Sequence, residues 1–219
     1  MIQMIYTGMS RPIAVMGREI TFFNQRCRDW THPYEWKAGD GDNLSNSGCG
    51  VFGLCHAAQW LTGRAFDPEE WADFSVANGG RGDDGTDRPG LLHGLMATGR
   101  NVETGLRYEE DGLRNDLDTL FAFLMAEKGV SLCNLRVGHI VCLIAARERE
   151  GQREVLAIDS YSESASDRVK DMVTELVPDT EIVWPVRNAA GLVTGSCVSS
   201  AAFWAKIETV KDFNLLYRL

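Results

Sequence analysis

A cysteine between two glycines, Gly48-Cys49-Gly50, stands directly before an apolar segment with helical spacing. The first turn of a helix leaves backbone N–H groups unpaired and carries a partial positive charge, so a thiol placed there ionises more readily. The flanking glycines allow a tight turn and a close approach of a substrate backbone. The pattern indicates a nucleophilic thiolate at Cys49, although it is also typical of a buried cysteine beside a glycine turn.

A histidine and an aspartate border two apolar segments farther along the chain. His139 opens the segment 140–144, and Asp159 directly follows Ala157-Ile158. Their separation of about 20 residues suits a hairpin that turns near Gly151 and brings both to the same end. An aspartate that accepts from one imidazole nitrogen fixes the tautomer, so the other nitrogen faces the cysteine. A core histidine and an Asx turn are the alternatives.

Gln25 is the fourth candidate, about 24 residues before Cys49 and directly after a short apolar run. A side-chain amide aimed at the cysteine would donate a hydrogen bond to an oxyanion, with the backbone N–H of Cys49 as the second donor. A solvated loop glutamine is the alternative. We expect Cys49, His139 and Asp159 to meet in one cleft, with the sulfur within roughly 4 Å of a ring nitrogen.

Helical patterns occupy the chain between the cysteine and the histidine. The clearest is 51–62, where apolar residues recur at i, i+3, i+4 and i+7 and Gly63 follows as a C-cap. Further helices are expected over about 68–78, 91–98 and 113–127, the first of them opened by Asp67-Pro68.

Strand patterns dominate the rest of the sequence. Strands are expected at 14–16, 20–23, 130–135, 139–145, 154–158, 181–186 and 198–207, a helix at 169–177, and loops at 24–46 and 160–167. Helices first and strands afterwards predict a single α+β domain over 1–219. Its helical part covers about 49–128 and its mostly antiparallel sheet about 130–219.

Composition narrows the classes of partner. Of 219 residues, 44% are hydrophobic and 24% charged, as in an average globular protein, and the net charge of -9 argues against nucleic acid and anionic membranes. The sequence has no apolar stretch long enough for membrane insertion and no pattern of a secretory signal, and its six cysteines are too sparse for a disulfide framework. A cytoplasmic protein with reduced thiols is expected, although a toxin exported by a dedicated system would look the same.

Other polar residues take no part in the predicted site. No cysteines or histidines have zinc spacing, so neither a metal nor a cofactor is expected. Cys55 and Cys142 lie on apolar faces and should be inert, and His56 is expected to point elsewhere. The aspartates of 83–87 are expected to form a solvated turn.

In order and spacing, these motifs resemble papain-like cysteine peptidases, and among them are most similar to bacteriocin-processing (double-glycine leader) peptidases. The segments that carry the resemblance are Phe23-Asn24-Gln25 with Trp30 nearby, Gly48-Cys49-Gly50, Trp60-Leu61-Thr62-Gly63, Asp67-Pro68-Glu69-Glu70, Gly138-His139-Ile140-Val141 and Ala157-Ile158-Asp159-Ser160. The chain departs from the family at Val51 and Ser160, where proline is frequent. The part from about 169 to 219 matches nothing in the family.

The resemblance implies a papain-like fold with a cleft between the helical part and the sheet. It implies Cys49 as nucleophile, His139 as base, Asp159 as the residue that orients it, and Gln25 as oxyanion donor. The expected activity is that of a cysteine peptidase or related amide or isopeptide hydrolase, acting on a peptide or protein substrate without a cofactor. A transglutaminase-like acyl transferase or deamidase, and a non-catalytic binding module that kept the fold, are the alternatives.

Overall fold

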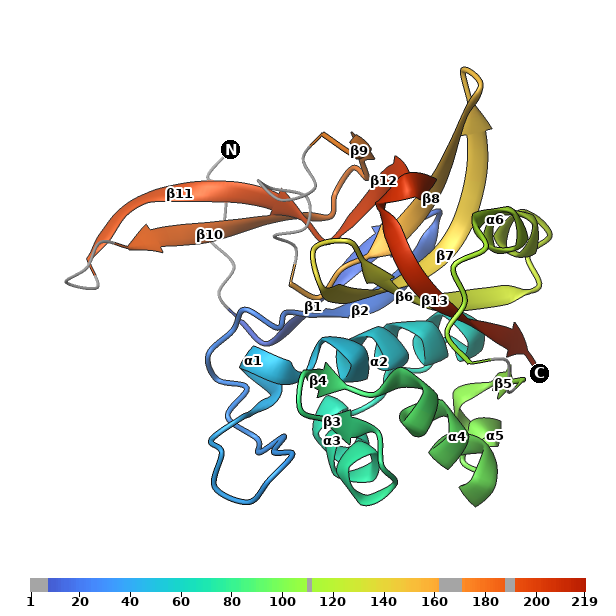
Figure 1. Cartoon of the computed structure of the whole chain (residues 1–219). Helices are drawn as coiled ribbons and strands as arrows, with labels where there is room; N and C mark the ends of the chain where they lie inside the picture. The colour runs from blue at the N-terminus through green and yellow to red at the C-terminus, as the bar shows by residue number, and fades with distance from the viewer. Residues whose placement is uncertain (1–7, 110–111, 162–170, 188–191) are drawn as a thin grey trace.

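A computed structural model describes residues 8–109, 112–161, 171–187 and 192–219, and it combines helices with one large sheet and smaller two-stranded ribbons (Figure 1). The helices are α1 (Leu44–Ser47), α2 (Cys49–Thr62), α3 (Pro68–Ala77), α4 (Arg88–Thr98), α5 (Asn101–Thr104) and α6 (Leu117–Met125). The strands are β1 (Ser10–Val15), β2 (Arg18–Phe23), β3 (Arg81–Gly82), β4 (Gly85–Thr86), β5 (Leu106–Tyr108), β6 (Gly129–Leu135), β7 (His139–Arg149), β8 (Gln152–Ile158), β9 (Val173–Leu176), β10 (Glu181–Arg187), β11 (Val193–Ser200), β12 (Ala202–Lys206) and β13 (Val210–Arg218). The α+β class is therefore confirmed.

The large sheet has seven strands in the order β5-β13-β6-β7-β8-β12-β9, and every neighbouring pair is antiparallel. Both faces of its centre are covered, by α2 on one side and α6 on the other (Figure 1). Val141 and Leu143 of β7 pack on the α6 side, and Cys142 and Ile144 pack on the α2 side. This explains the uninterrupted apolar run of β7, because a strand buried on both faces needs no polar alternation.

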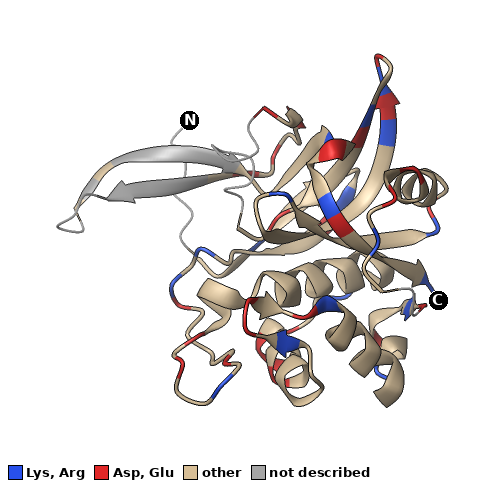
Figure 2. Cartoon of the chain, in the orientation of Figure 1, with Lys and Arg blue, Asp and Glu red and all other residues tan. Residues whose placement is uncertain are grey.

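Helix α2 lies at the centre of the molecule. It carries no charged residue (Figure 2), and every position from Gly50 to Trp60 is buried, as expected for a helix covered on all sides. Its neighbours are β6 and β7 on one side and β2 and α3 on others. Gly53 lies against the sheet, where an added Cβ would meet the Leu132 side chain at 3.1 Å. Gly63 ends the helix with φ +74°.

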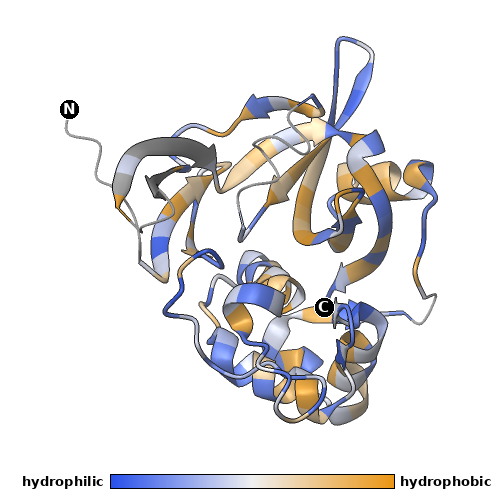
Figure 3. Cartoon of the chain, turned by 60° about the vertical axis from the view of Figure 1, so that its left-hand side comes forward, coloured by the Kyte–Doolittle hydropathy of each residue, from blue (hydrophilic) through white to orange (hydrophobic). Residues whose placement is uncertain are grey.

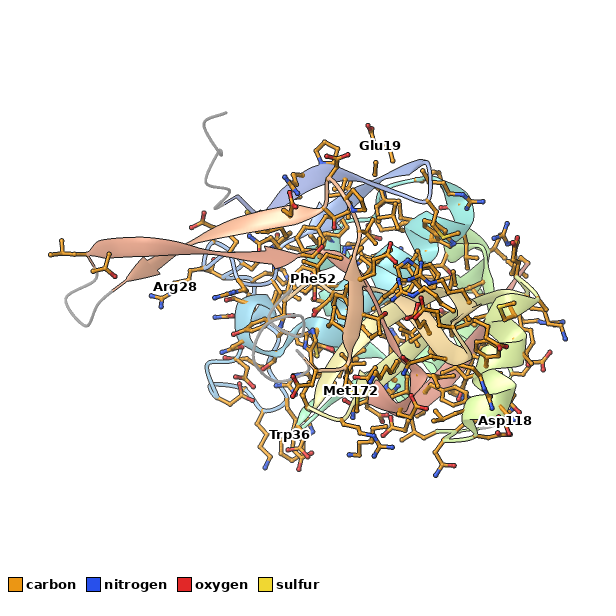
Figure 4. The ribbon with its side chains drawn as sticks, turned by 90° about the horizontal axis from the view of Figure 1, so that it is seen from above. Glu19, Arg28, Trp36, Phe52, Asp118 and Met172 are labelled. Atoms are coloured by element: carbon orange, nitrogen blue, oxygen red, sulfur yellow. The ribbon has the colours of Figure 1, made fainter. Side chains whose placement is uncertain are left out.

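Hydropathy and side-chain positions agree with this layering. Apolar residues concentrate in the helices and in the body of the sheet, whereas the projecting β7–β8 turn is polar (Figure 3). Seen from above, Phe52 of α2 lies near the middle of the molecule, and Glu19, Trp36 and Asp118 lie at its rim (Figure 4). No helix of the described ranges is long and apolar enough to cross a membrane.

Two predictions of secondary structure are wrong. The helix expected over 169–177 is instead the edge strand β9, paired with β12; residues 169–170 lie outside the described ranges. The single strand expected over 198–207 is two strands, because Ala201 forms a bend between them. Strand β11 pairs with β10 in a separate ribbon and β12 with β8 in the large sheet, so long-range pairing decided both segments.

Other elements differ in extent or were not expected. The helix predicted from 113 begins at Leu117, after the cap Asp116, whose carboxylate accepts from Thr119 N at 3.3 Å. Helix α1 and strand β13 were missed, and β13 lies inside the sheet between β5 and β6. Most of the loop expected at 160–167 lies outside the described residues. The ribbon of β10 and β11 projects from the body (Figures 1 and 4).

Candidate active site

Cys49 is the first residue of α2, and its two glycines are required by packing. A Cβ at Gly48 would fall 2.6 Å from the Leu44 carbonyl oxygen, and a Cβ at Gly50 would overlap the side chain of Thr86 in β4. The glycines therefore let α1 and the β3–β4 ribbon close around the start of α2. Cys49 remains partly exposed, as a reacting group must be.

His139 and Asp159 meet as the hairpin of β7 and β8 predicts. The Nε2 atom of His139 lies 2.6 Å from Oδ1 of Asp159, whose side chain is fully buried. The backbone N–H of Tyr161 donates to the same oxygen at 2.9 Å, and Asp159 N donates to Ala201 O at 2.9 Å. The aspartate is thus held from two directions, and the ring nitrogen Nδ1 of His139 is left for the cysteine.

The electrostatics of this group favour an ion pair between Cys49 and His139. Burial raises the pKa of the Cys49 thiol, but the hydrogen bonding and positive charge of His139 outweigh it, and the pKa lies below the usual 9.0. Burial works against the charged form of His139, but the charge and hydrogen bond of Asp159, followed by those of Cys49, raise its pKa to about 10. The shifts of both partners therefore favour the charged pair, thiolate and imidazolium, over the neutral pair.

Gln25 is a buried residue, so the alternative of a solvated loop glutamine is wrong. The residue is 2% exposed. Its backbone N–H donates to Ser160 O at 2.9 Å, and its side-chain Oε1 accepts from Ser160 Oγ at 3.1 Å. The amide oxygen is therefore occupied, and Nε2 is the group that Gln25 can offer as a donor. Ser160, one of the departures from the resembled family, supplies both contacts.

Three of the four candidates line one cleft. The fourth, Asp159, is fully buried. A cavity of about 420 Å³ is lined by Gln25, Cys49, His139 and Tyr161 among others. A second cavity of about 400 Å³ also contains Cys49 and runs along residues 82–89. The two cavities also share Asp84, Gly85 and Gly138, so the hollow has two arms that meet at the cysteine.

Tyr34 stands behind the cleft in a polar network that the sequence did not indicate. Its hydroxyl lies 2.9 Å from both Ser75 Oγ and Thr86 Oγ1, and burial raises the pKa of Tyr34 to about 12. The buried guanidinium of Arg81 donates to Tyr34 O at 2.8 Å and to the carboxylate of Asp42 at 2.5 Å. These contacts tie the long loop to the β3–β4 ribbon that forms one wall. No local pattern could reveal them, because each joins residues about 40 or more positions apart.

His56 lines neither cavity, but it is not a surface residue. Its side chain is fully buried in α2, and Nε2 accepts a hydrogen bond from Phe23 N at 3.1 Å. Burial lowers the pKa of His56 to about 3, against a smaller effect of the charge of Asp159, so the ring is neutral. The sequence signal for its position was the spacing of two helical turns after Cys49, which places both residues on the same side of the helix.

The other described cysteines have the properties of inert thiols. Burial raises the pKa of each of them; they are Cys27, Cys55, Cys133 and Cys142. The side chain of Cys197 lies outside the described part. Within the ranges described, no cluster of three or more His, Cys, Asp or Glu side chains is arranged to hold a metal ion. Comparison of the chain with protein-family models, curated proteins and solved structures finds no match.

Proposed function

We propose that this chain is a papain-like cysteine peptidase or a related amide hydrolase. The observation that carries the proposal is the alignment of three side chains, in which buried Asp159 lies 2.6 Å from one nitrogen of His139 and the same ring interacts with Cys49. A thiolate at a helix start, paired with an oriented imidazolium, is the arrangement that nucleophilic acyl transfer needs. The packing of α2 against an antiparallel sheet that carries His139 and Asp159 also supports the papain-like fold.

The reaction follows from the positions of these groups. The Cys49 thiolate attacks a carbonyl carbon, and the oxygen that becomes negative accepts hydrogen bonds from the N–H of Cys49 and the amide of Gln25. His139 gives its proton to the leaving amine as the carbon–nitrogen bond breaks. The neutral His139 then takes a proton from water as the water attacks the thioester; the carbon–sulfur bond breaks, the acid is released, and Cys49 and His139 return as thiolate and imidazolium.

The two arms of the cleft suggest how a substrate lies. The leaving amine must reach His139, so its part of the substrate belongs in the arm lined by His139 and Tyr161. The acyl part then occupies the arm along residues 82–89. Two arms that meet at Cys49 suit an internal segment of a chain, in agreement with a peptide or protein substrate.

The test is acylation by para-nitrophenyl acetate followed by mapping of the modified cysteine. Cys49 should be acylated preferentially, because its thiol alone among the described cysteines has a lowered pKa and partial exposure. Cys197→Ser serves as the matched control and should keep full reactivity. Preferential labelling of another cysteine in the folded protein would count against Cys49 as nucleophile, and product analysis with an added amine would separate hydrolysis from acyl transfer.

A further inference from the structure

The strand that leads to Gln25 is held on its inner edge by side chains of α2 instead of a second strand. On its outer edge β2 pairs with β1, and Pro12, which has no N–H, stands opposite Thr21. The backbone groups of Thr21 and Phe23 therefore face away from β1, toward the nucleophile helix. Buried backbone groups of this kind need partners.

Two side chains of α2 supply those partners. In the amide orientation that satisfies both groups, Gln59 accepts from Thr21 N at 2.6 Å and donates to Thr21 O at 3.2 Å. One helical turn earlier, His56 Nε2 accepts from Phe23 N at 3.1 Å. Both side chains are buried. We call these contacts, Gln59–Thr21 and His56–Phe23, the α2–β2 ladder.

The ladder sets the register that brings Gln25 to Cys49. Its contacts advance along β2 from 21 to 23, toward Gln25, and along α2 from 59 to 56, toward Cys49. Strand β2 ends at Phe23, two residues before Gln25, and α2 begins at Cys49, about two helical turns before His56. A slip of one residue along β2 would turn its side chains to the opposite faces and displace the turn that carries Gln25.

The surroundings of His56 indicate that its imidazole serves the hydrogen bond to Phe23 N. Its ring is stacked with Phe22 and Phe23, at centroid distances of 5.7 and 5.6 Å, in a site that would suit an apolar side chain. A neutral ring that accepts at Nε2 carries its proton on Nδ1, which has no partner among the described residues. Such a buried donor without a partner destabilises the folded chain. An apolar side chain at position 56 would avoid the cost of burying the Nδ1 donor, but it would offer no acceptor to Phe23 N.

We infer that His56 and Gln59 are positioning residues that hold the end of β2 in register, so that the amide of Gln25 faces the oxyanion formed at Cys49. The inference rests on the proposed function for its catalytic consequence. Neither residue lines the described cavities or interacts with Cys49, so they act through β2. The ladder itself is a property of the fold and is measurable without activity.

The experiment compares two reactions of Cys49 in His56→Leu, which removes the acceptor and keeps an apolar side chain. Acylation by para-nitrophenyl acetate creates an oxyanion and should slow about 10- to 100-fold. Alkylation by iodoacetamide creates none and should change less than about twofold. His56→Gln, which places an amide oxygen within similar reach, should recover most of the acylation rate. Cys55→Ala, in a neighbouring buried position, should leave the ratio of the two rates unchanged.

A double-mutant cycle separates positioning from general loosening of the site. In a Gln25→Ala background, His56→Leu should have no further effect on acylation, because the group it positions is absent. Independent, additive effects, or a wild-type acylation rate in folded His56→Leu, would overturn the inference. Hydrogen exchange at the amides of Thr21 and Phe23 gives a readout without chemistry, and the Phe23 amide should lose protection in His56→Leu. If exchange responds in this way but wild-type Cys49 is never acylated, the proposed function fails and the ladder stands.

Discussion

His139 and His56 are both buried, but only His139 contacts a carboxylate, and the two histidines acquire opposite charge states. Burial disfavours the charged form of both. His139 lies 2.6 Å from the carboxylate of Asp159, and its pKa is raised to about 10. The charge of the same aspartate acts on His56 without a hydrogen bond, and the pKa of His56 falls to about 3. A contacting carboxylate, and not burial, therefore decides which histidine is charged.

The difference divides the site into two halves with separate tasks. One half holds the ionisable groups, Asp159 and His139 from the large sheet and Cys49 from α2. The half on the β1–β2 hairpin is neutral: His56 and Gln59 bond the backbone of β2, and the Ser160 hydroxyl donates to Gln25. In the proposed reaction, the charged groups generate the nucleophile, and the neutral donors stabilise the negative oxygen of the substrate without neutralising the thiolate.

The largest expected effect comes from removing a charge from the half that holds the ionisable groups. Asp159→Asn keeps the size of the side chain but no longer fixes the tautomer or stabilises the imidazolium, so turnover of an acyl substrate should fall by about 10³–10⁴. Steady-state kinetics on the first substrate that reports turnover measures the effect. A loss below tenfold in the folded variant would mean that Asp159 does not orient His139.

The neutral half should contribute less to turnover than the half that contains Asp159 and His139. Gln25→Ala should lower turnover by about 10²–10³, the typical cost of one oxyanion donor, with little change in substrate binding. Gln25→Glu should be worse, because a carboxylate repels the oxyanion and raises the pKa of the thiol. Wild-type rates for both variants would show that another donor completes the oxyanion hole.

The ion pair also predicts that alkylation of Cys49 depends less on pH than alkylation of a free thiol. An ordinary thiol with a pKa near 9 reacts about tenfold faster per pH unit up to that value. The pKa of Cys49 is lowered and that of His139 is about 10, so the rate with iodoacetamide should rise less than expected for a free thiol between pH 7 and 9. Stopped-flow alkylation measures this, and Asp159→Asn should restore part of the slope. A full tenfold rise per unit in the wild type would exclude the ion pair.

The smallest effect is on stability, and it belongs to His56. Its pKa is about 3 in the folded chain against 6.5 when unfolded, so its contribution to the free energy of unfolding is complete above pH 6.5. As the pH falls toward 3 this contribution is lost by about 1.4 kcal/mol per unit. His139 has the opposite sign, with a contribution present below 6.5 and lost toward pH 10.

Urea unfolding at pH 7 and pH 5 isolates the contribution of His56. The wild type should lose about 2 kcal/mol more than His56→Leu over this interval, because only the wild type must keep a neutral buried imidazole. His139 is present in both proteins and cancels in the comparison. Equal losses in the two proteins would mean that His56 is charged, or accessible to water, in the native state.

Local sequence patterns predicted the parts of the site that local contacts build. Helix α2 was predictable because its apolar residues recur with helical spacing and Gly63 ends it. The pairing of His139 with Asp159 was predictable because a single hairpin joins them. The strand β9 was not predictable, since pairing with β12 decided its conformation. Strand β13 was missed, and its partners lie in β5 and β6, far away in the sequence.

Residue types and spacing alone indicated which groups could carry chemistry: a cysteine at a helix start, and a histidine and an aspartate at neighbouring strand ends. The surroundings of the remaining groups depend on contacts between segments that are far apart in the chain. The tertiary structure buried Gln25 against Ser160, 135 residues away, and it joined His56 to Phe23 across 33 residues. The physical reason is that a side chain's charge and hydrogen bonds depend on the dielectric and the partners around it, and distant segments of the chain supply both.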